Sequence, residues 1–147
     1  MIDPPDRLLV VRNDKLGDFV LALPTFALLR QALPQTQLFA LVPQYTAPIA
    51  QLCPAIDQVV IDPGATGAGG SPLALAHHLA RYQLDAALTL FSTTRVAIAL
   101  LAARIPYRLA PATKIAQVFY NHRLTQRRSR STQPEFQYNL DLARHYL

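Results

Sequence analysis

Residues 7–24, RLLVVRNDKLGDFVLALP, decide how the rest of the chain is interpreted. An apolar run from Leu8 to Val11 gives way to a short polar loop that begins at Arg12. Gly17 and Asp18 then introduce an apolar stretch with helical spacing. This order predicts a strand, a loop and a helix. Ligands of open α/β sheets bind where the strands end, so any chemistry of this loop should involve Asp18.

The next part of the chain repeats the same alternation. Short apolar runs typical of buried strands occur at residues 8–11, 38–42, 59–61 and 86–90. Helical patterns lie between and after them, at residues 19–33, 46–52, 72–82 and 93–103. Pro24 predicts a kink or a late start in the first helix. The order βαβαβαβα predicts an α/β fold, a Rossmann-like parallel sheet with helices on both faces.

The pattern weakens after Pro106. Residues 107–109 are compatible with a short strand, and residues 113–130 are polar and basic. A helical pattern closes the chain over residues 135–147, where Phe136, Leu140, Ala143 and Leu147 are spaced to share one face. The sequence stops inside this pattern, so we expect further chain to follow it.

Composition limits the classes of protein that the chain can be. Its 147 residues suit one domain, and 51% hydrophobic with 16% charged residues indicate a globular protein. No apolar run reaches the roughly 18 residues of a membrane helix, and the start, MIDPPDR, does not resemble a signal peptide. The single cysteine, Cys53, fits a reducing compartment and a packed thiol.

The chain is basic, with a formal net charge of +5, and most of its basic residues are arginines. Arg123, Arg127, Arg128 and Arg130 fall close together. Arginine binds phosphate and carboxylate groups in a bidentate manner. An anionic partner is therefore expected, either a phosphorylated glycolipid, a nucleotide or nucleic acid. The cluster is also compatible with an ordinary solvated surface.

Two roles for Asp18 are open on the sequence alone. At the start of a helix it could be a capping or first-turn acid, which the helix dipole stabilises. It could also be a general base that removes a proton from a sugar hydroxyl. Lys15 could hold an anionic group of a substrate, or it could pair with Asp14.

Other motifs are absent or weak. The glycine-rich segment 62–71 lacks the lysine and the spacing of a phosphate-binding loop, so we interpret it as a connection. No G-x-G-x-x-G follows the first strand, which argues against a dinucleotide-binding dehydrogenase. His77 and His78 have no partner at metal-ligand spacing and are assigned to a helix surface. The sequence places no two carboxylates together.

The chain resembles glycosyltransferase family 9, the lipopolysaccharide heptosyltransferases. One matching feature is R-x-D-x-L-G-D at residues 12–18, followed by L-P-x-x-x-x-L-R at residues 23–30. Another is P-x-Y at residues 43–45 followed by P-A-I-D-x-V at residues 54–59. The last is N-H-R at residues 121–123, then Glu135 and Y-N-L at residues 138–140.

The resemblance implies a GT-B fold, in which two Rossmann-like domains face one another across a cleft. It implies an inverting, metal-independent transfer of heptose from ADP-heptose to a core sugar of lipopolysaccharide, without a cofactor. Asp18 aligns with the family's proposed catalytic base. The substrate-binding residues it implies are Asn13, Lys15, Gly17, His122 and Arg123.

The resemblance also implies an assignment of domains and partners. Residues 1–147 correspond to the N-terminal, acceptor-side domain, and the donor-binding C-terminal domain is absent from this chain. We expect a lipopolysaccharide core or lipid A-linked acceptor, a nucleotide sugar held through the other domain, and no nucleic acid. A cytoplasmic location, with peripheral contact to the bacterial inner membrane, follows. The alternative is a non-catalytic α/β domain that binds an anionic partner through its arginine-rich loop.

Overall fold

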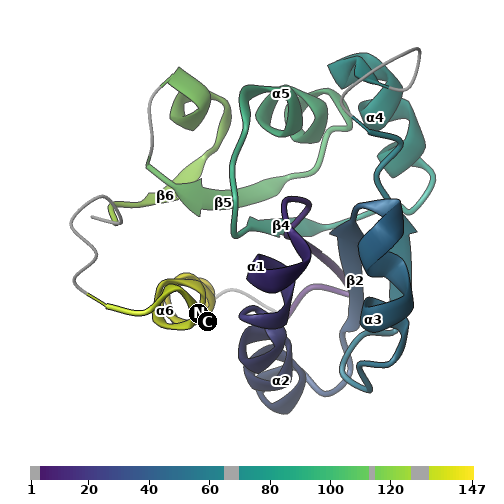
Figure 1. The fold of residues 1–147 in the computed structure, drawn as a ribbon. Coiled ribbons are helices and arrows are strands. Elements are labelled where there is room, and N and C mark those ends of the chain that lie inside the picture. The colour runs from purple at the N-terminus through teal and green to yellow at the C-terminus, as the bar shows by residue number, and fades with distance from the viewer. Residues whose placement is uncertain (1–3, 65–69, 113–114, 127–132) are drawn as a thin grey trace.

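The computed structural model describes residues 4–64, 70–112, 115–126 and 133–147, and its centre is a sheet of six parallel strands (Figure 1). The strands are ordered β3-β2-β1-β4-β5-β6, so β1 and β4 lie side by side in the middle. Every neighbouring pair is parallel. The strand bounds are β1 Arg7–Val11, β2 Gln37–Val42, β3 Gln58–Ile61, β4 Ala86–Thr89, β5 Tyr107–Pro111 and β6 His122–Leu124.

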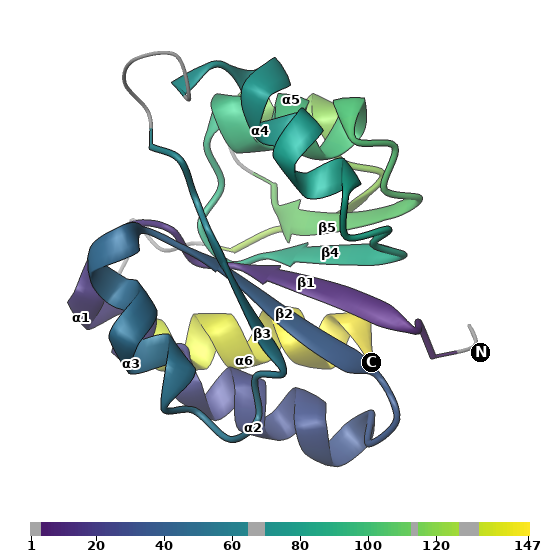
Figure 2. The ribbon, with the colours of Figure 1, turned by 90° about the vertical axis from the view of Figure 1, so that its right-hand side faces the viewer.

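Helices cover both faces of this sheet (Figure 2). On one face lie α1 Leu16–Val20, α2 Leu23–Ala32, the short 3₁₀ helix η1 Gln44–Thr46, α3 Ala47–Gln51 and α6 Glu135–Tyr146. On the other lie α4 Pro72–Ala80, α5 Thr94–Ala102 and the 3₁₀ helix η3 Ile115–Phe119. The predicted α/β fold with helices on both faces is confirmed. Within the described residues, no helix has the length and apolar character to cross a membrane.

Local sequence explains where several helices begin. The hydroxyl of Ser71 accepts a hydrogen bond from the amide of Ala74, and Thr93 caps α5 through the amide of Val96. Pro24 stands in the first turn of α2, where its missing N–H costs nothing. The predicted helix over residues 19–33 is therefore two helices, with α1 ending before Pro24.

The core forms two layers because β-strand side chains alternate between the faces of a sheet. Leu8 and Val10 pack under α1, α2 and α6 against Phe19 and Phe26. Leu9 and Val11 point the other way, into the layer formed with α4 and α5. The four apolar side chains of β1, from Leu8 to Val11, are fully buried, so the central strand is apolar on both faces, as parallel strands are.

Two expectations from the end of the chain are corrected. The basic segment contains a strand, β6, whose three residues are too few for the sequence pattern to show. The face that α6 buries is formed by Tyr138, Asn139, Leu142 and Ala143, whereas Phe136 and Leu147 are exposed. The predicted helix is confirmed, but its buried face includes Tyr138 and Asn139 in place of the expected Phe136 and Leu147. Arg127, Arg128 and Arg130 lie outside the described residues.

Replacing Phe26 by alanine should destabilise the fold by about 3–5 kcal/mol, because it leaves a cavity between α2 and the sheet. The free energy of unfolding from urea denaturation measures this loss. Phe136→Ala is the matched control, because Phe136 is 38% exposed and should cost under about 1 kcal/mol. Equal losses for the two variants would contradict the assigned core.

Candidate active site

The strand order places a crevice at the carboxyl ends of β1 and β4. After β1 the chain turns toward β2, and after β4 it turns toward β5, so the two following loops diverge. Ligands of open α/β sheets bind at such a switch point. Arg12 and Phe91 lie on either side of it, with the guanidinium carbon 5.7 Å from the centre of the ring.

Arg12 is the buried cation of this crevice, with 3% of its side chain exposed. One terminal nitrogen, Nη1, donates to Glu135 Oε1 at 3.2 Å and to Asn139 Oδ1 at 3.3 Å. It also donates to the carbonyl oxygen of Leu90 at 3.4 Å. The guanidinium therefore joins the loop after β1 to the end of β4 and to the first turns of α6.

The other side of the guanidinium faces two aspartates. Nη2 of Arg12 donates to Asp14 Oδ2 at 3.1 Å, and Nε lies 3.0 Å from Asp14 Oδ1. Nη2 also lies 3.5 Å from Asp18 Oδ1. Arg12 thus brings together two carboxylates that the sequence alone did not pair. It was not among the predicted site residues, although its position as the first residue of the polar loop and of the R-x-D-x-L-G-D motif could have marked it.

The pKa of Asp14 is raised to about 6. Burial is the main cause, and the positive charge of Arg12 opposes it. The neighbouring carboxyl group of Asp18 raises the pKa of Asp14 further. Asp14 is 13% exposed and Asp18 34%, so Asp18 is the carboxylate that a ligand can reach.

Asp18 occupies the first turn of α1, as one of its two predicted roles requires. The N-cap position belongs to Lys15, which makes no side-chain capping bond. A Cβ atom added to Gly17 would meet no other atom within 4 Å, so the packing of the described residues does not explain the glycine. The backbone beside Asp18 is open to a ligand.

A hollow of about 660 Å³ adjoins this loop, and Asn13, Asp14 and Lys15 line it. Tyr45, from the P-x-Y sequence after β2, closes one side and donates its hydroxyl to the carbonyl oxygen of Asp14 at 2.7 Å. Two of the predicted site residues, Asn13 and Lys15, therefore line this hollow, whereas Gly17 and Asp18 are not among its lining residues.

Asp62 and Arg95 form the far wall of the hollow. The two side chains form a bidentate pair, with nitrogen–oxygen distances of 2.9 and 2.8 Å, and Asn13 Nδ2 donates to Asp62 at 2.7 Å. Burial alone would raise the pKa of Asp62, but the bonds from Arg95, the Gly64 amide and Asn13 outweigh it and lower the pKa. The lowered pKa favours the carboxylate form of Asp62, which holds the side-chain amide of Asn13 by a hydrogen bond.

His122 and Arg123 are not brought to this crevice. His122 begins β6 and stacks on Tyr107 at 3.9 Å between ring centres, where β5 begins. Burial is the main reason that the pKa of His122 is lowered, and the charges of His145 and Arg108 add to it. Arg123 is exposed on the outermost strand. β5 lies between β6 and β4 in the sheet, and neither His122 nor Arg123 lines the hollow beside the loop after β1.

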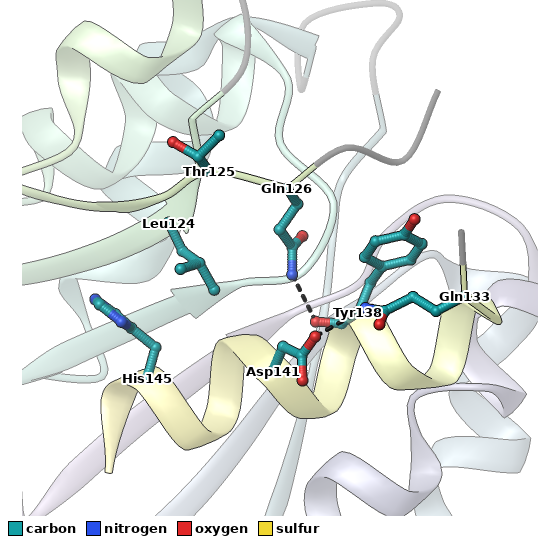
Figure 3. Close-up of a pocket in the computed structure, with 7 residues that line it drawn as sticks. All are labelled: Leu124, Thr125, Gln126, Gln133, Tyr138, Asp141 and His145. Carbon is teal, nitrogen blue, oxygen red and sulfur yellow. Dashed lines mark hydrogen bonds between the residues drawn. The ribbon is translucent and has the colours of Figure 1, made fainter. Parts of the chain in front are cut away.

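A second hollow, of about 460 Å³, lies between the end of β6 and α6 (Figure 3). Gln126 donates to the carbonyl oxygen of Tyr138 there at 2.8 Å. Asp141 and His145 of α6 line it, on a side of the helix next to that of Glu135 and Asn139, which bind Arg12. No lysine or arginine is among its described lining residues, which distinguishes it from the hollow beside Asp18.

Some residues of the recognised motifs are structural. Arg30 pairs with Asp57, and Asp57 also accepts the amide of Leu38 at 2.8 Å, which fixes the loop before β3. Asn121 accepts the amide of Arg108 at 2.7 Å and donates to the carbonyl oxygen of Pro106, which joins β5 to the segment before β6. These contacts lie at the starts of strands, away from Asp18.

Among the described residues, no three or more His, Cys, Asp or Glu side chains gather in a way that could hold a metal ion. The two neighbouring carboxylates of the crevice, Asp14 and Asp18, already share the Arg12 cation. The chemistry this arrangement supports directly is acid–base chemistry by the exposed Asp18.

Arg12→Met should lower the free energy of unfolding by about 3 kcal/mol, because it removes the buried positive charge that pairs with the partly buried carboxylates of Asp14 and Glu135. Urea denaturation at pH 7 measures the loss. Arg123→Met removes an exposed arginine and should change stability by under about 1 kcal/mol. A loss no larger in Arg12→Met than in this control would show that Arg12 does not hold the crevice together.

No family model matches the chain. A Haemophilus influenzae protein named "Putative glycosyltransferase" is 47% identical over 142 residues, which are 97% of this chain and 41% of the relative. The chain therefore spans about two fifths of the length of the curated relative that it matches.

Solved structures share the fold at lower identity. A glycosyltransferase family 9 protein of Veillonella parvula superimposes with a TM-score of 0.80 at 18% identity, over 95% of this chain and 40% of that one. The ADP-heptose lipopolysaccharide heptosyltransferase II of E. coli gives 0.78 at 19% identity, over 93% and 40%. E. coli heptosyltransferase WaaC with ADP gives 0.72 at 18% identity, over 96% and 47%. The chain has the fold of one Rossmann-like half of these proteins, as the resemblance in the sequence implied.

Proposed function

We propose that this chain is the acceptor-side part of a glycosyltransferase in which Asp18 is the general base. The observation that carries the proposal is the exposed carboxylate of Asp18 at the switch point, directly after a loop whose residues Asn13, Asp14 and Lys15 line a hollow large enough for a sugar. The 47% identical relative with a glycosyltransferase name supports the reaction class. The family 9 fold of the structural neighbours supports it independently.

The reaction proposed is transfer of a heptose from ADP-heptose to a sugar hydroxyl of lipopolysaccharide. The Asp18 carboxylate takes the proton of the acceptor hydroxyl while that oxygen forms a bond to the anomeric carbon of the donor. The bond from the anomeric carbon to the phosphate oxygen breaks, and ADP leaves with the electron pair. Attack from the side opposite the leaving group inverts the anomeric configuration. No step of this proposal requires a metal or another cofactor.

The hollow provides contacts suited to such an acceptor. Lys15 supplies a positive charge for a phosphate or carboxylate group of the saccharide, and Tyr45 supplies a ring on which a sugar can stack. Asn13 presents an amide that Asp62 fixes. The bare backbone at Gly17 leaves room for the acceptor to approach Asp18 closely. His122 and Arg123 are left out of this proposal because of their place in the fold.

The donor contacts are assigned to a second unit outside residues 1–147. This assignment is supported by the length of the structural neighbours, of which the chain covers less than half. We propose that the acceptor is a lipid A-linked core saccharide, which would bring the protein to the inner face of the bacterial inner membrane.

Asp18→Asn should lower kcat by about 10²–10⁴-fold with little change in KM, because the amide cannot accept the hydroxyl proton. The assay measures ADP release from ADP-heptose with a heptose-accepting core saccharide, in the natural gene product that contains residues 1–147. Asp141→Asn is the matched control, since Asp141 is 38% exposed and lines the second hollow, away from the crevice. Turnover in Asp18→Asn equal to that of the control would remove Asp18 from the mechanism.

A further inference from the structure

Asn13 is the residue of the hollow whose side chain is fixed by contacts from a distant part of the chain. It stands in the loop after β1, and its Nδ2 donates to Asp62 Oδ2 at 2.7 Å. Asp62 is buried directly after β3, 49 residues further along the sequence. Two neighbouring strands of the sheet therefore set the position of this amide, and the proposed reaction leaves open which group of a ligand the amide recognises.

Asp62 is an ionised carboxylate with several donors. Arg95, in the first turn of α5, donates from Nη1 to Oδ2 at 2.9 Å and from Nη2 to Oδ1 at 2.8 Å. The amide of Gly64 donates to Oδ1 at 3.0 Å. Burial acts to raise the pKa of Asp62, but the bonds from Arg95, Gly64 and Asn13 together lower it. The carboxylate form is therefore the one present at neutral pH.

Arg95 is itself held in place. Its Nε donates to the carbonyl oxygen of Gly70 at 2.9 Å, and Nη2 donates to that of Gly64 at 2.7 Å. The guanidinium thus joins α5 to two points of the connection between β3 and α4. Asn13, Asp62 and Arg95 all line the hollow, so this wall is built from three separate segments that hold one another.

The carboxylate of Asp62 decides which end of the Asn13 amide faces it. A carboxylate only accepts hydrogen bonds, so the atom 2.7 Å away has to be the amide nitrogen. A reversed amide would place two acceptor oxygens against each other. The oxygen Oδ1 and one N–H of Asn13 remain for a ligand. Within the described part of the chain, no residue donates a hydrogen bond to this oxygen.

The free end of the amide suits a hydroxyl group. A saccharide hydroxyl can donate to Oδ1 and can accept from the remaining N–H. An ionised carboxylate or phosphate group has no proton to donate, and its oxygens would repel Oδ1. Lys15 lines the same hollow, and its ammonium group only donates. The hollow therefore offers one contact for a neutral hydroxyl and another for an anionic group.

We propose that Asn13 is a specificity-determining residue of the acceptor site, because its Oδ1 accepts a hydrogen bond from one hydroxyl of the saccharide. Asp62, held by Arg95, is the positioning residue that keeps this oxygen available to the ligand. The inference rests on the proposed function of the hollow as the acceptor site, and it adds which group of the acceptor is recognised there. The saccharide binds with this hydroxyl at Asn13 and with its anionic group at Lys15.

The test is isothermal titration calorimetry of the natural gene product that contains residues 1–147. The probes are a deacylated lipopolysaccharide core saccharide and its monodeoxygenated analogues, each of which lacks one hydroxyl. Wild type should bind at least one analogue about tenfold more weakly than the parent saccharide. Asn13→Ala should bind the parent about tenfold more weakly than wild type does, and should bind that analogue equally well as the parent.

Gln137→Ala is the control, because it shortens another side-chain amide, on α6 and outside the hollow. It should keep the preference of wild type for the parent saccharide. The same preference in Asn13→Ala as in wild type would overturn the proposal. Failure of wild type to bind the saccharide, or equal binding of the parent and every analogue, would also overturn it.

Asp62→Asn tests the positioning role. The new amide can donate to Oδ1 of Asn13, so the Asn13 amide can turn over and lose its fixed oxygen. The preference for the parent over the same analogue should disappear although Asn13 is present. A purely structural role would lower the melting temperature and leave this preference unchanged, which would contradict the positioning role. If Asp62→Asn does not fold by circular dichroism, Asn13→Ala decides the inference.

The outcomes for Asn13 and Asp18 are separable. Loss of the preference in Asn13→Ala together with full turnover in Asp18→Asn would reject the base and retain the hydroxyl contact. Loss of turnover in Asp18→Asn together with an unchanged preference in Asn13→Ala would retain the base and reject this inference.

Discussion

The guanidinium of Arg12 is the contact on which the crevice depends. It is 3% exposed, so its charge is stable inside the protein only while carboxylates and carbonyl oxygens surround it. Those partners come from the loop after β1, from the end of β4 and from α6, up to 127 residues away in the sequence. One buried cation therefore ties the start of the chain to its last helix and sets the place of Asp18.

This dependence explains how the recognised sequence motifs divide. Arg12, Asp18, Tyr45, Glu135 and Asn139 all meet at the carboxyl edge of the sheet, directly or through one partner. Arg30 with Asp57, and Asn121 with Arg108, brace loops at the starts of strands. Motif residues at the carboxyl edge of the sheet are thus placed to act on a ligand, whereas those at the starts of the strands stabilise the fold.

Local pattern was sufficient for much of the fold. Local patterns located five of the six strands, and the helical pattern from residue 72 marked the start of α4, because these signals are confined to a few neighbouring residues. The same logic placed Asp18 in the first turn after β1. It could not show β6, which is three residues long, nor the face of α6, where buried Asn139 serves Arg12 instead of the apolar core. The meeting of Asp14 and Asp18 also depended on a cation whose partners are distant in the chain.

The central claim is that the acceptor saccharide binds at the edge where Arg12 positions Asp18. The opposite edge offers a competing, more apolar hollow of about 580 Å³ lined by Pro5, Tyr107 and Tyr146. The most direct measurement is the set of backbone amide shifts in ¹⁵N NMR spectra on titration with a deacylated lipopolysaccharide core saccharide. The account predicts shifts at Asn13–Asp18, Tyr45 and Thr93–Arg95, with Tyr107 and Tyr146 unmoved. Shifts confined to Tyr107 and Tyr146 would contradict it.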